Sequence, residues 1–128
     1  MAITSKVLKE KYDPTATAFS IVAGEDLSAG NALSISPNDG LVYNVVDGYT
    51  IVGVSNVDVA EGETVKVQTG TWEFPTESDV SALDVGKTAY FVIGSGTVSA
   101  ESSGNESGGT IVAVERAGWA FVHILYPL

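Results

Sequence analysis

Cysteine is absent from the sequence, which excludes a disulfide framework and any metal site built on thiolates. Histidine is nearly as scarce, because His123 is the only one. A serine or threonine nucleophile needs a base beside it, and this histidine lies inside an apolar run, where packing or an interface is its usual role. We therefore expect no catalytic residue and a fold that depends on its core and its subunit contacts.

Long apolar runs and basic residues are also scarce. No stretch approaches the roughly 18 apolar residues of a membrane span, and the N-terminus lacks the apolar run of a signal peptide. We expect a soluble product of the cytoplasm that made it, with no membrane partner. Three of the six basic residues lie in the first eleven positions, against one acidic residue. From Tyr12 onward three basic residues face fifteen acidic ones, and so acidic a body argues against a nucleic-acid partner.

Short β-branched and aromatic runs, separated by turn residues, fill the chain from about residue 15 onward. This pattern predicts an all-β fold, a compact antiparallel β-barrel or β-sandwich of about eight short strands. We expect the strands at residues 17–22, 32–36, 41–46, 49–55, 64–69, 88–93, 110–116 and 119–126. Residues 77–83 predict one short helical turn, capped by Ser78 or Asp79.

Turn residues and composition organise the rest of the chain. Asp47-Gly48 and Ala117-Gly118 lie between apolar runs at hairpin spacing, so we expect the strands on either side of each to be antiparallel neighbours. Residues 101–109 carry no apolar side chain and predict a mobile loop. The Lys-rich start of the chain lacks the strand pattern. We therefore divide the chain into an extended N-terminal arm, residues 1–14, and a single β domain, residues 15–128.

Two of the expected strands are apolar on both faces. Residues 119–126 and 49–54 place apolar side chains at both alternations of the strand, whereas a sheet with one wet face alternates apolar with polar residues. A domain of this size has little room to cover both faces of several strands. We therefore expect other subunits or a partner to bury part of this surface.

Acidic residues form no convincing reactive group. The pairs Glu61 with Glu63 and Glu73 with Glu77 lie in or beside expected turns of an acidic chain, and solvated turns explain them better than acid–base catalysis. Asp58 and its acidic neighbours lack the spacing of an EF-hand loop. We therefore expect no metal.

Two further patterns carry little weight. Gly86-Lys87-Thr88 resembles the end of a phosphate-binding loop, but Ser81 stands where that motif requires glycine. The aromatic residues have one alternative to core packing or subunit contact, which is a flat platform for stacking sugars; its members are Tyr43, Tyr49, Trp72 and Trp119. Nothing in their spacing requires that platform. We expect no enzyme activity and no cofactor.

Seven segments follow one another in an informative order. They read A-G-E-D-L-S-A-G at 23–30, G-Y-T-I-V-G-V-S at 48–55, A-E-G-E-T-V-K-V at 60–67, G-T-W-E-F-P at 70–75, V-G-K-T-A-Y-F-V at 85–92, G-T-I-V-A-V at 109–114 and A-F-V-H-I-L at 120–125. This series resembles the small capsid decoration, or cement, proteins of tailed bacteriophages. The resemblance covers most of the body, and the Lys-rich arm departs from it.

The resemblance implies a non-enzymatic protein on the exterior of the virion. Such a protein binds the major capsid protein of the expanded shell as an oligomer, a homotrimer first and a dimer second, and stabilises the shell. The alternative is a carbohydrate-binding or tail- or fibre-associated β module of the virion. The residues that we expect to contact the capsid or a neighbouring subunit are Lys6, Val7, Leu8, Lys9, Lys11, Tyr12, Trp72, Phe74, Trp119, Phe121 and His123.

Overall fold

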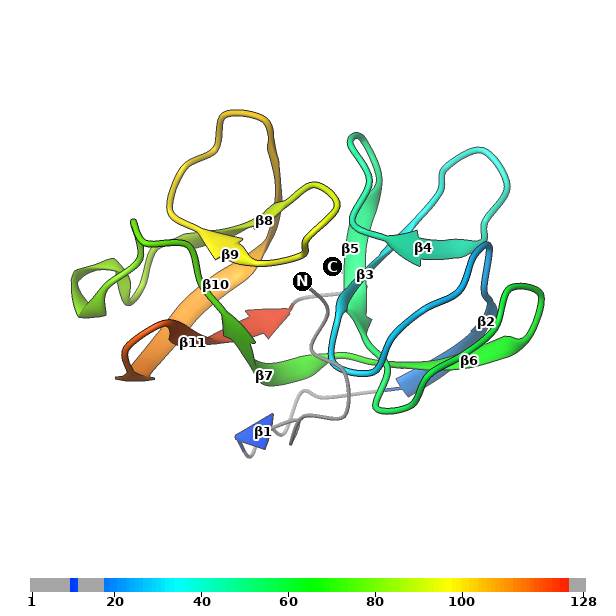
Figure 1. Ribbon diagram of the computed structural model, residues 1–128, viewed down its shortest axis with the longest axis horizontal. Coiled ribbons are helices and arrows are strands. Elements are labelled where there is room, and N and C mark those ends of the chain that lie inside the picture. The colour runs from blue at the N-terminus through cyan, green and yellow to red at the C-terminus, as the bar shows by residue number, and fades with distance from the viewer. Residues whose placement is uncertain (1–9, 12–17, 125–128) are drawn as a thin grey trace.

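Two antiparallel β-sheets account for nearly all the regular structure (Figure 1). The computed structural model describes residues 10–11 and 18–124. Sheet A has the strand order β1-β7-β11-β10-β8-β9, and sheet B has the order β2-β6-β5-β3-β4. The strands are β1 Glu10–Lys11, β2 Ala18–Val22, β3 Ala32–Ile35, β4 Val42–Asn44, β5 Thr50–Val54, β6 Thr64–Gln68, β7 Gly70–Pro75, β8 Thr88–Val92, β9 Val98–Ser99, β10 Asn105–Arg116 and β11 Trp119–Ile124. The predicted all-β class is confirmed, as a sandwich-like pair of sheets and not as a closed barrel.

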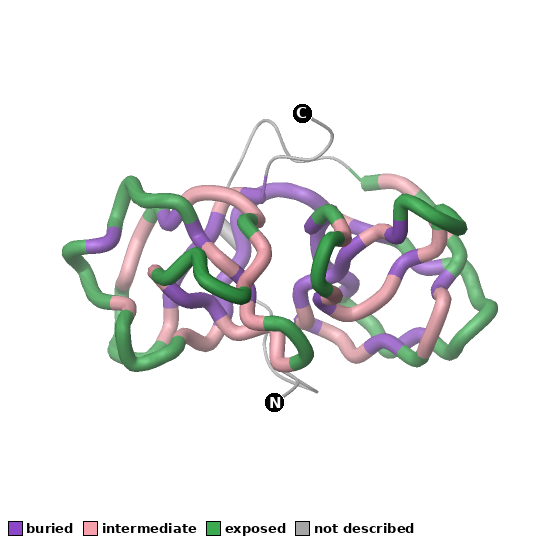
Figure 2. Tube along the Cα trace, turned by 90° about the horizontal axis from the view of Figure 1, so that it is seen from above, coloured by how far each residue is buried: buried purple, intermediate pink, exposed green. Residues whose placement is uncertain are grey.

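The two sheets form neighbouring lobes that share buried segments (Figure 2). One core cluster joins them, because it contains Phe74 and Phe91 from sheet A together with Ile51 and Val54 from sheet B. A second cluster belongs to sheet B and its loops, and its buried residues are Ala23, Leu27, Leu33, Val42, Val52, Val59, Val65 and Val67. Each fully buried large apolar side chain stabilises the fold by about 1.5–3 kcal/mol, so both clusters contribute substantially.

Strand β5 lies between the two clusters. Ile51 and Val54 pack in the shared cluster, and Val52 packs in the cluster of sheet B. All three side chains are at most 4% exposed. The chain itself therefore covers both faces of this strand, since loop residues such as Leu27 and Val59 pack in the same cluster as Val52. Burial of other apolar surface by a second subunit stays a prediction.

The predicted hairpin at Asp47-Gly48 is wrong in its pairing. Strands β4 and β5 are both hydrogen-bonded to β3, which lies between them in sheet B. The turn forms, with Gly48 at a φ of +83°, but it connects next-nearest strands. The other predicted hairpin, at Ala117-Gly118, is confirmed because β10 pairs with β11 directly.

Sheet A contains strand segments that the sequence pattern missed. Strands β7 and β9 were not expected, and β10 begins at Asn105, inside the segment predicted as a mobile loop. Asn105 to Thr110 pair with β8, with a register shift between Ser107 and Gly109. A side chain at Gly108 would overlap the ring of Phe91, so a larger residue there would have to displace that buried ring.

The expected helical turn occurs later in the chain than predicted. A 3-10 helix, η1, spans Ala82–Asp84 and is capped by Ser81, not by Ser78 or Asp79. The Ser81 hydroxyl accepts a hydrogen bond from the Leu83 amide, and the Asp84 carboxylate accepts one from the Ser81 amide. This reciprocal pair is a capping box, which satisfies backbone donors that a short helix leaves unpaired.

Part of the expected arm belongs to a sheet. Residues Glu10–Lys11 form β1, which pairs with Trp72 and Thr71 at the edge of sheet A. The start of the chain thus reaches the same sheet that contains β11.

Candidate functional site: the outer face of sheet A

Strands β7 and β11 divide their side chains between a core face and an outer face. Trp72 and Phe74 belong to the core cluster, with Ala120, Val122 and Ile124 of β11 beside them. The intervening residues form the outer face, where the register pairs Thr71 with His123, Glu73 with Phe121 and Pro75 with Trp119. Side chains alternate between the two faces of a strand, so these three pairs lie in a row. We call this row, with Arg116 of β10, the outer face.

A buried ion pair lies at one end of the outer face. The Arg116 guanidinium donates from Nη2 to Glu73 Oε1 at 2.8 Å and from Nε to Oε2 at 3.3 Å. The Glu73 side chain is 2% exposed, whereas that of Arg116 is 49% exposed. The guanidinium also stacks 4.1 Å from the centroid of the Trp119 ring. Bidentate pairing and stacking fix the arginine in one orientation, so the face presents an ordered cation and an aromatic ring together.

The burial of Glu73 corrects the prediction of a solvated acidic turn. Glu73 lies in the middle of β7, and both oxygens of its carboxylate accept hydrogen bonds from the Arg116 guanidinium. A buried carboxylate is costly unless it is paired. Glu73 therefore serves to position Arg116.

The remainder of the outer face mixes aromatic and polar side chains. Thr71 Oγ1 lies 3.1 Å from His123 Nδ1, a hydrogen-bond distance that ties β7 to β11. Phe121 is 3% exposed, while Trp119 and His123 are half-buried. The face is thus polar at the ladder position of His123 and aromatic toward Trp119.

The predicted contact residues separate into three groups. Trp119 and His123 lie on the outer face with part of their surface accessible, and Phe121 lies between them but is buried. Trp72 and Phe74 point into the core: the indole Nε1 of Trp72 donates to the Thr69 carbonyl at 2.9 Å, and the ring of Phe74 packs edge-on against that of Phe91.

The remaining predicted contact residues belong to the arm. Lys11 is in β1, at the edge of the same sheet. The others, Lys6, Val7, Leu8, Lys9 and Tyr12, lie outside the described residues. The structure thus places one predicted arm residue, Lys11, in a strand that pairs with β7, and β7 carries part of the outer face.

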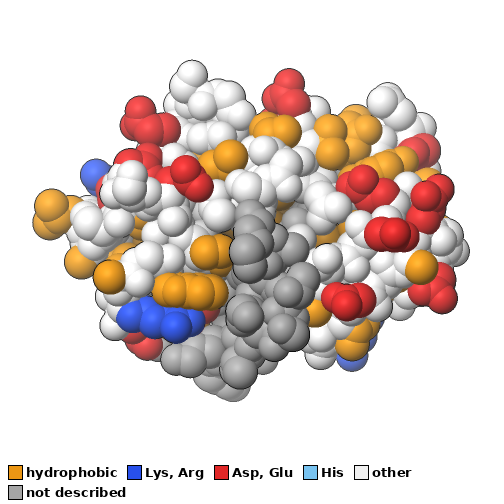
Figure 3. Space-filling view, in the orientation of Figure 1, with side chains coloured by type: hydrophobic (Ala, Val, Ile, Leu, Met, Phe, Trp, Pro, Cys, Tyr) orange, Lys and Arg blue, Asp and Glu red, His pale blue; other side chains and the backbone are white. Residues whose placement is uncertain are grey.

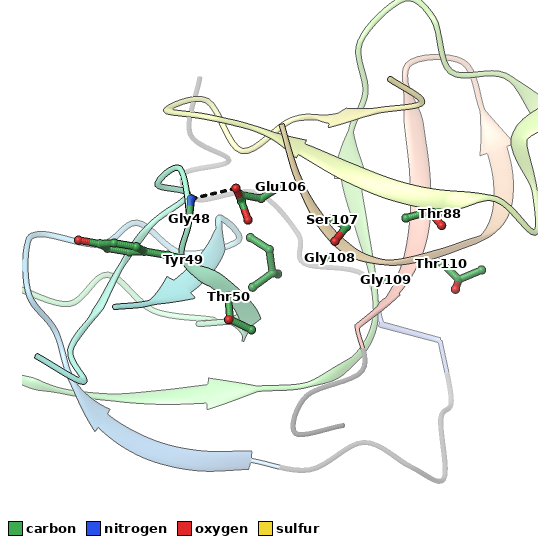
Figure 4. Close-up of a pocket in the computed structure, with 10 residues that line it drawn as sticks. Gly48, Tyr49, Thr50, Thr88, Glu106, Ser107, Gly108, Gly109 and Thr110 are labelled. Atoms are coloured by element: carbon green, nitrogen blue, oxygen red, sulfur yellow. Dashed lines mark hydrogen bonds between the residues drawn. The ribbon is translucent and has the colours of Figure 1, made fainter. Parts of the chain in front are cut away.

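A cleft of about 560 Å³ lies where the two lobes meet (Figure 4). Its lining comes from the start of β5 on one side and from β8 and β10 on the other, with Ile51 and Gly108 among the apolar contacts. The Gly48 amide donates to Glu106 Oε2 at 2.9 Å across the cleft. The ring of Tyr49 is directed away from Ser107 and Thr88 in Figure 4, so this cleft offers hydroxyl groups and not an aromatic floor.

The described residues include no group of three or more histidine, aspartate, glutamate or cysteine side chains that could hold a metal ion. The Lys87 ammonium, in the triplet that resembles a phosphate-binding loop, lies 3.4 Å from the Asp84 carboxylate. Within residues 10–11 and 18–124 no helix is long and apolar enough to cross a membrane. What these residues offer is binding chemistry: an ordered guanidinium, half-buried aromatic rings and an open cleft.

Sequence reasoning missed Arg116 and Glu73 as members of the site. Arg116 carried one usable signal, since it is among three basic residues in the body of the chain. Glu73 carried none, because a lone acidic residue beside two aromatic residues looks the same whether it is buried or exposed.

The geometry defines an all-β protein of two antiparallel sheets in a sandwich-like arrangement, with an arginine-aromatic outer face on one of them. A solved structure of this fold is the N base of head fiber gp8.5 in bacteriophage phi29. The two structures superpose with a TM-score of 0.56 over 87% of this chain and 95% of that chain, at 19% sequence identity. No family model matches the chain, and no curated protein matches it by sequence.

Proposed function

We propose that this chain is a non-enzymatic structural protein of a phage virion, which binds the outer surface of the expanded capsid as an oligomer and stabilises the shell. Its partners are the major capsid protein and other copies of itself, a homotrimer first and a dimer second. The observation that carries the proposal is the likeness in fold to the base of a phage head fiber, over nearly the full length of both chains. The ordered series of turns and strands that resembles capsid decoration proteins supports it independently.

The outer face of sheet A supplies a contact surface of suitable chemistry. Arginine and tryptophan are among the residue types that dominate the energetics of protein interfaces. Here Arg116 stacks on Trp119 in a fixed orientation. A guanidinium held in place loses less rotamer freedom on binding. Its remaining hydrogen-bond capacity suits a carboxylate or a backbone carbonyl of the shell.

The arm supplies the second contact in this proposal. Its lysines are Lys6, Lys9 and Lys11, in a segment whose net charge is +2, and β1 attaches it to the edge of sheet A. An acidic patch on the shell would attract it. Because an oligomer engages several arms and several faces at once, weak individual contacts add up to high avidity.

The test is co-sedimentation of the purified protein with undecorated expanded capsids of the cognate phage, with unexpanded procapsids as the control. We expect saturable binding to expanded capsids alone. Deletion of residues 1–11 should then weaken binding while the body stays folded, whereas Lys66→Gln, which removes one exposed charge from sheet B, should bind as the parent protein does. Absence of binding to either capsid form would refute the proposal.

A second candidate follows from the fold likeness, since the similar structure is the base of a head fiber. The chain would then serve as a fiber-associated or glycan-binding module of the virion. The hydroxyl groups that line the cleft, from Thr50, Thr88, Ser107 and Thr110, are suited to hydrogen bonds with a sugar. A glycan array with the purified oligomer separates the two candidates, because a capsid-stabilising protein has no need of a saturable glycan ligand.

A further inference from the structure

The turn between β7 and β8 presents a large apolar side chain to solvent. Leu83, within η1, is 85% exposed. Val85 is 46% exposed. Val112 of β10 is 40% exposed and follows Ile111, whose backbone amide and carbonyl are hydrogen-bonded to Lys87 and Gly86 of this turn. A single exposed leucine is common, but neighbouring exposed apolar residues are the mark of an interaction surface. We call Leu83, Val85 and Lys87 the knob, which belongs to the green turn at the left of Figure 1.

The knob is held rigidly. Ser81 and Asp84 close a capping box around the turn, and Asp84, which is 7% exposed, also lies 3.4 Å from the Lys87 ammonium. Backbone hydrogen bonds from Gly86 to the Ile111 carbonyl and from Ile111 to the Lys87 carbonyl fasten the turn to β10. A side chain displayed on an ordered turn loses little freedom when it binds, which favours a specific contact.

The knob combines apolar surface with positive charge. The Lys87 side chain is 65% exposed, and Lys87 is one of three basic residues in a body that carries fifteen acidic ones. The surface that complements the knob is therefore apolar at its centre and acidic at its edge.

The opposite lobe carries a surface of that description. Residues 24–30 and 56–63 form two adjoining loops of sheet B, joined by the Leu27–Val59 bridge. Val57 is 54% exposed. Together the loops contain five acidic residues and no lysine or arginine: Glu25, Asp26, Asp58, Glu61 and Glu63. Acidic side chains gather over this lobe, at the right of Figure 3.

Hydrogen bonds keep these acidic loops ordered. The Asp26 carboxylate accepts from the Glu61 amide, and the Asp58 carboxylate accepts from the Ala29 amide, both at 2.9 Å. The carboxylates of Asp26 and Asp58, the latter next to Val57 in the chain, are therefore held in place by the loop backbone. We call residues 24–30 and 56–63 the acidic loops.

We propose that the knob of one copy docks on the acidic loops of a second copy. Leu83 and Val85 would cover Val57, and Lys87 would face the carboxylates of Asp58 and its neighbours. The two surfaces are different and belong to different lobes, so the contact is head-to-tail. Repetition of such a contact closes into a ring when the rotation between copies allows it, and this identifies the interface of the oligomer on which the proposed function rests.

The first experiment measures oligomer mass by analytical ultracentrifugation. Leu83→Asp places a carboxylate against the acidic loops and should shift the protein to monomer, with a dissociation constant raised at least about tenfold. Ile93→Asp is the matched control, since Ile93 is also an exposed apolar residue of the sheet A lobe, at 36% exposure, and should leave the mass unchanged. Thermal melting of both variants confirms that they stay folded, because neither site is buried.

The second experiment tests the head-to-tail geometry. Val57→Asp should also give monomers, but an equimolar mixture of Leu83→Asp and Val57→Asp should form a pair, because the mixture retains one intact knob and one intact set of acidic loops. A mixture that stays monomeric would overturn the geometry. An unchanged oligomer mass for Leu83→Asp would overturn the whole inference. If that variant kept its mass but lost capsid binding, the inference would also fail, since the knob would then contact the shell and not a second copy. Failure of the parent oligomer to bind capsids would refute the proposed function and leave the knob contact standing.

Discussion

The two lobes of the molecule build their interiors from different side chains. The core that sheet A shares with β5 contains Trp72, Phe74 and Phe91, with the two phenylalanine rings 5.1 Å apart and nearly perpendicular. The buried residues of the sheet B cluster are alanine, leucine and valine alone. Aromatic rings bury more area for each residue than valine does. A few positions therefore carry much of the stability of sheet A, whereas sheet B spreads it over many.

The difference also extends to how the lobes treat charge. The lobe of sheet A buries two carboxylates: Arg116 compensates Glu73, and the Ser81 amide and the Lys87 ammonium compensate Asp84. Sheet B keeps its carboxylates at the surface, where several of them accept hydrogen bonds from loop amides, as Asp26 and Asp58 do. In one lobe a buried carboxylate orients Arg116, and in the other the surface carboxylates order the loops.

Truncation of a core side chain in each lobe gives the largest expected effect. Phe91→Ala should lower the free energy of unfolding by about 3–5 kcal/mol, because it removes a fully buried ring and leaves a cavity. Val65→Ala in sheet B, also fully buried, should cost about 2 kcal/mol. Urea unfolding measures both. Equal losses would show that the aromatic residues do not concentrate stability in sheet A.

Substitution of one glycine in each lobe gives the next largest effect on stability, and the loss should be similar in the two lobes. Gly53 and Gly109 share a φ of +153°, and a side chain at either would overlap the carbonyl oxygen of a neighbouring strand, at Gln68 and His123 respectively. Substitution of either by alanine should cost on the order of 3 kcal/mol from backbone strain and crowding.

The matched control for the glycine substitutions is Gly118→Ala. Gly118 also has a positive φ, of +81°, but nothing lies within 4 Å of the position of an added Cβ. This variant should cost only about 1 kcal/mol. If all three alanine variants lost the same stability in urea unfolding, close approach between strands would not be the cause.

The smallest expected effect is a pH dependence in sheet B. The Tyr43 hydroxyl donates to Asp39 Oδ2 at 2.6 Å, which lowers the pKa of Asp39 and raises the pKa of Tyr43 to about 12. The contribution of Tyr43 to stability is full below pH 10 and is lost as the pH rises toward 12, because the unfolded chain ionises first. The contribution of Asp39 to stability is present above the ordinary pKa of an aspartate and is lost as the pH falls below that value, because the unfolded chain takes up the proton first.

Comparison of variants isolates this pair from other titrating groups. The stability difference between the parent protein and Tyr43→Phe, measured by urea unfolding, should be constant up to pH 10 and should shrink between pH 10 and 12. Asp39→Asn should remove the alkaline change in the same way, since it removes the acceptor. A difference that stays constant to pH 12 would contradict the assignment.

The sequence pattern predicted the strands of sheet B better than those of sheet A, because the strands of sheet B have a clear pattern in their own residues. Strands such as β2 and β6 combine β-branched residues with flanking turns, so the pattern identifies them directly. Strand β7 has polar residues at every second position, but Glu73 is buried by Arg116 from a strand more than 40 residues away, and no local pattern records such a partner. The start of β10 has no apolar residue, and Phe91 of the neighbouring strand supplies its cover.

The candidate site divides in the same manner. Alternation along the last strand placed Trp119, Phe121 and His123 on one face, and the structure agrees. Trp72 and Phe74 were also expected among the contact residues, although they point into the core. The sequence does not show which face of a short strand an aromatic residue occupies. The knob was missed because exposure of Leu83 depends on where η1 meets β10.

The strand order of sheet A has a consequence for how the protein is synthesised. Sheet B draws all its strands from residues 18–68, so it can assemble as soon as that segment has left the ribosome. In sheet A, β11, which is the last strand among residues 18–124 to be translated, takes the place between β7 and β10. Until it arrives, the inner edges of β7 and β10 stay open to wrong partners. The nascent chain therefore carries one sheet with all its strands and one sheet that waits for Trp119–Ile124, while the core that the two sheets share is still incomplete. Premature termination before that strand would release a product prone to aggregate.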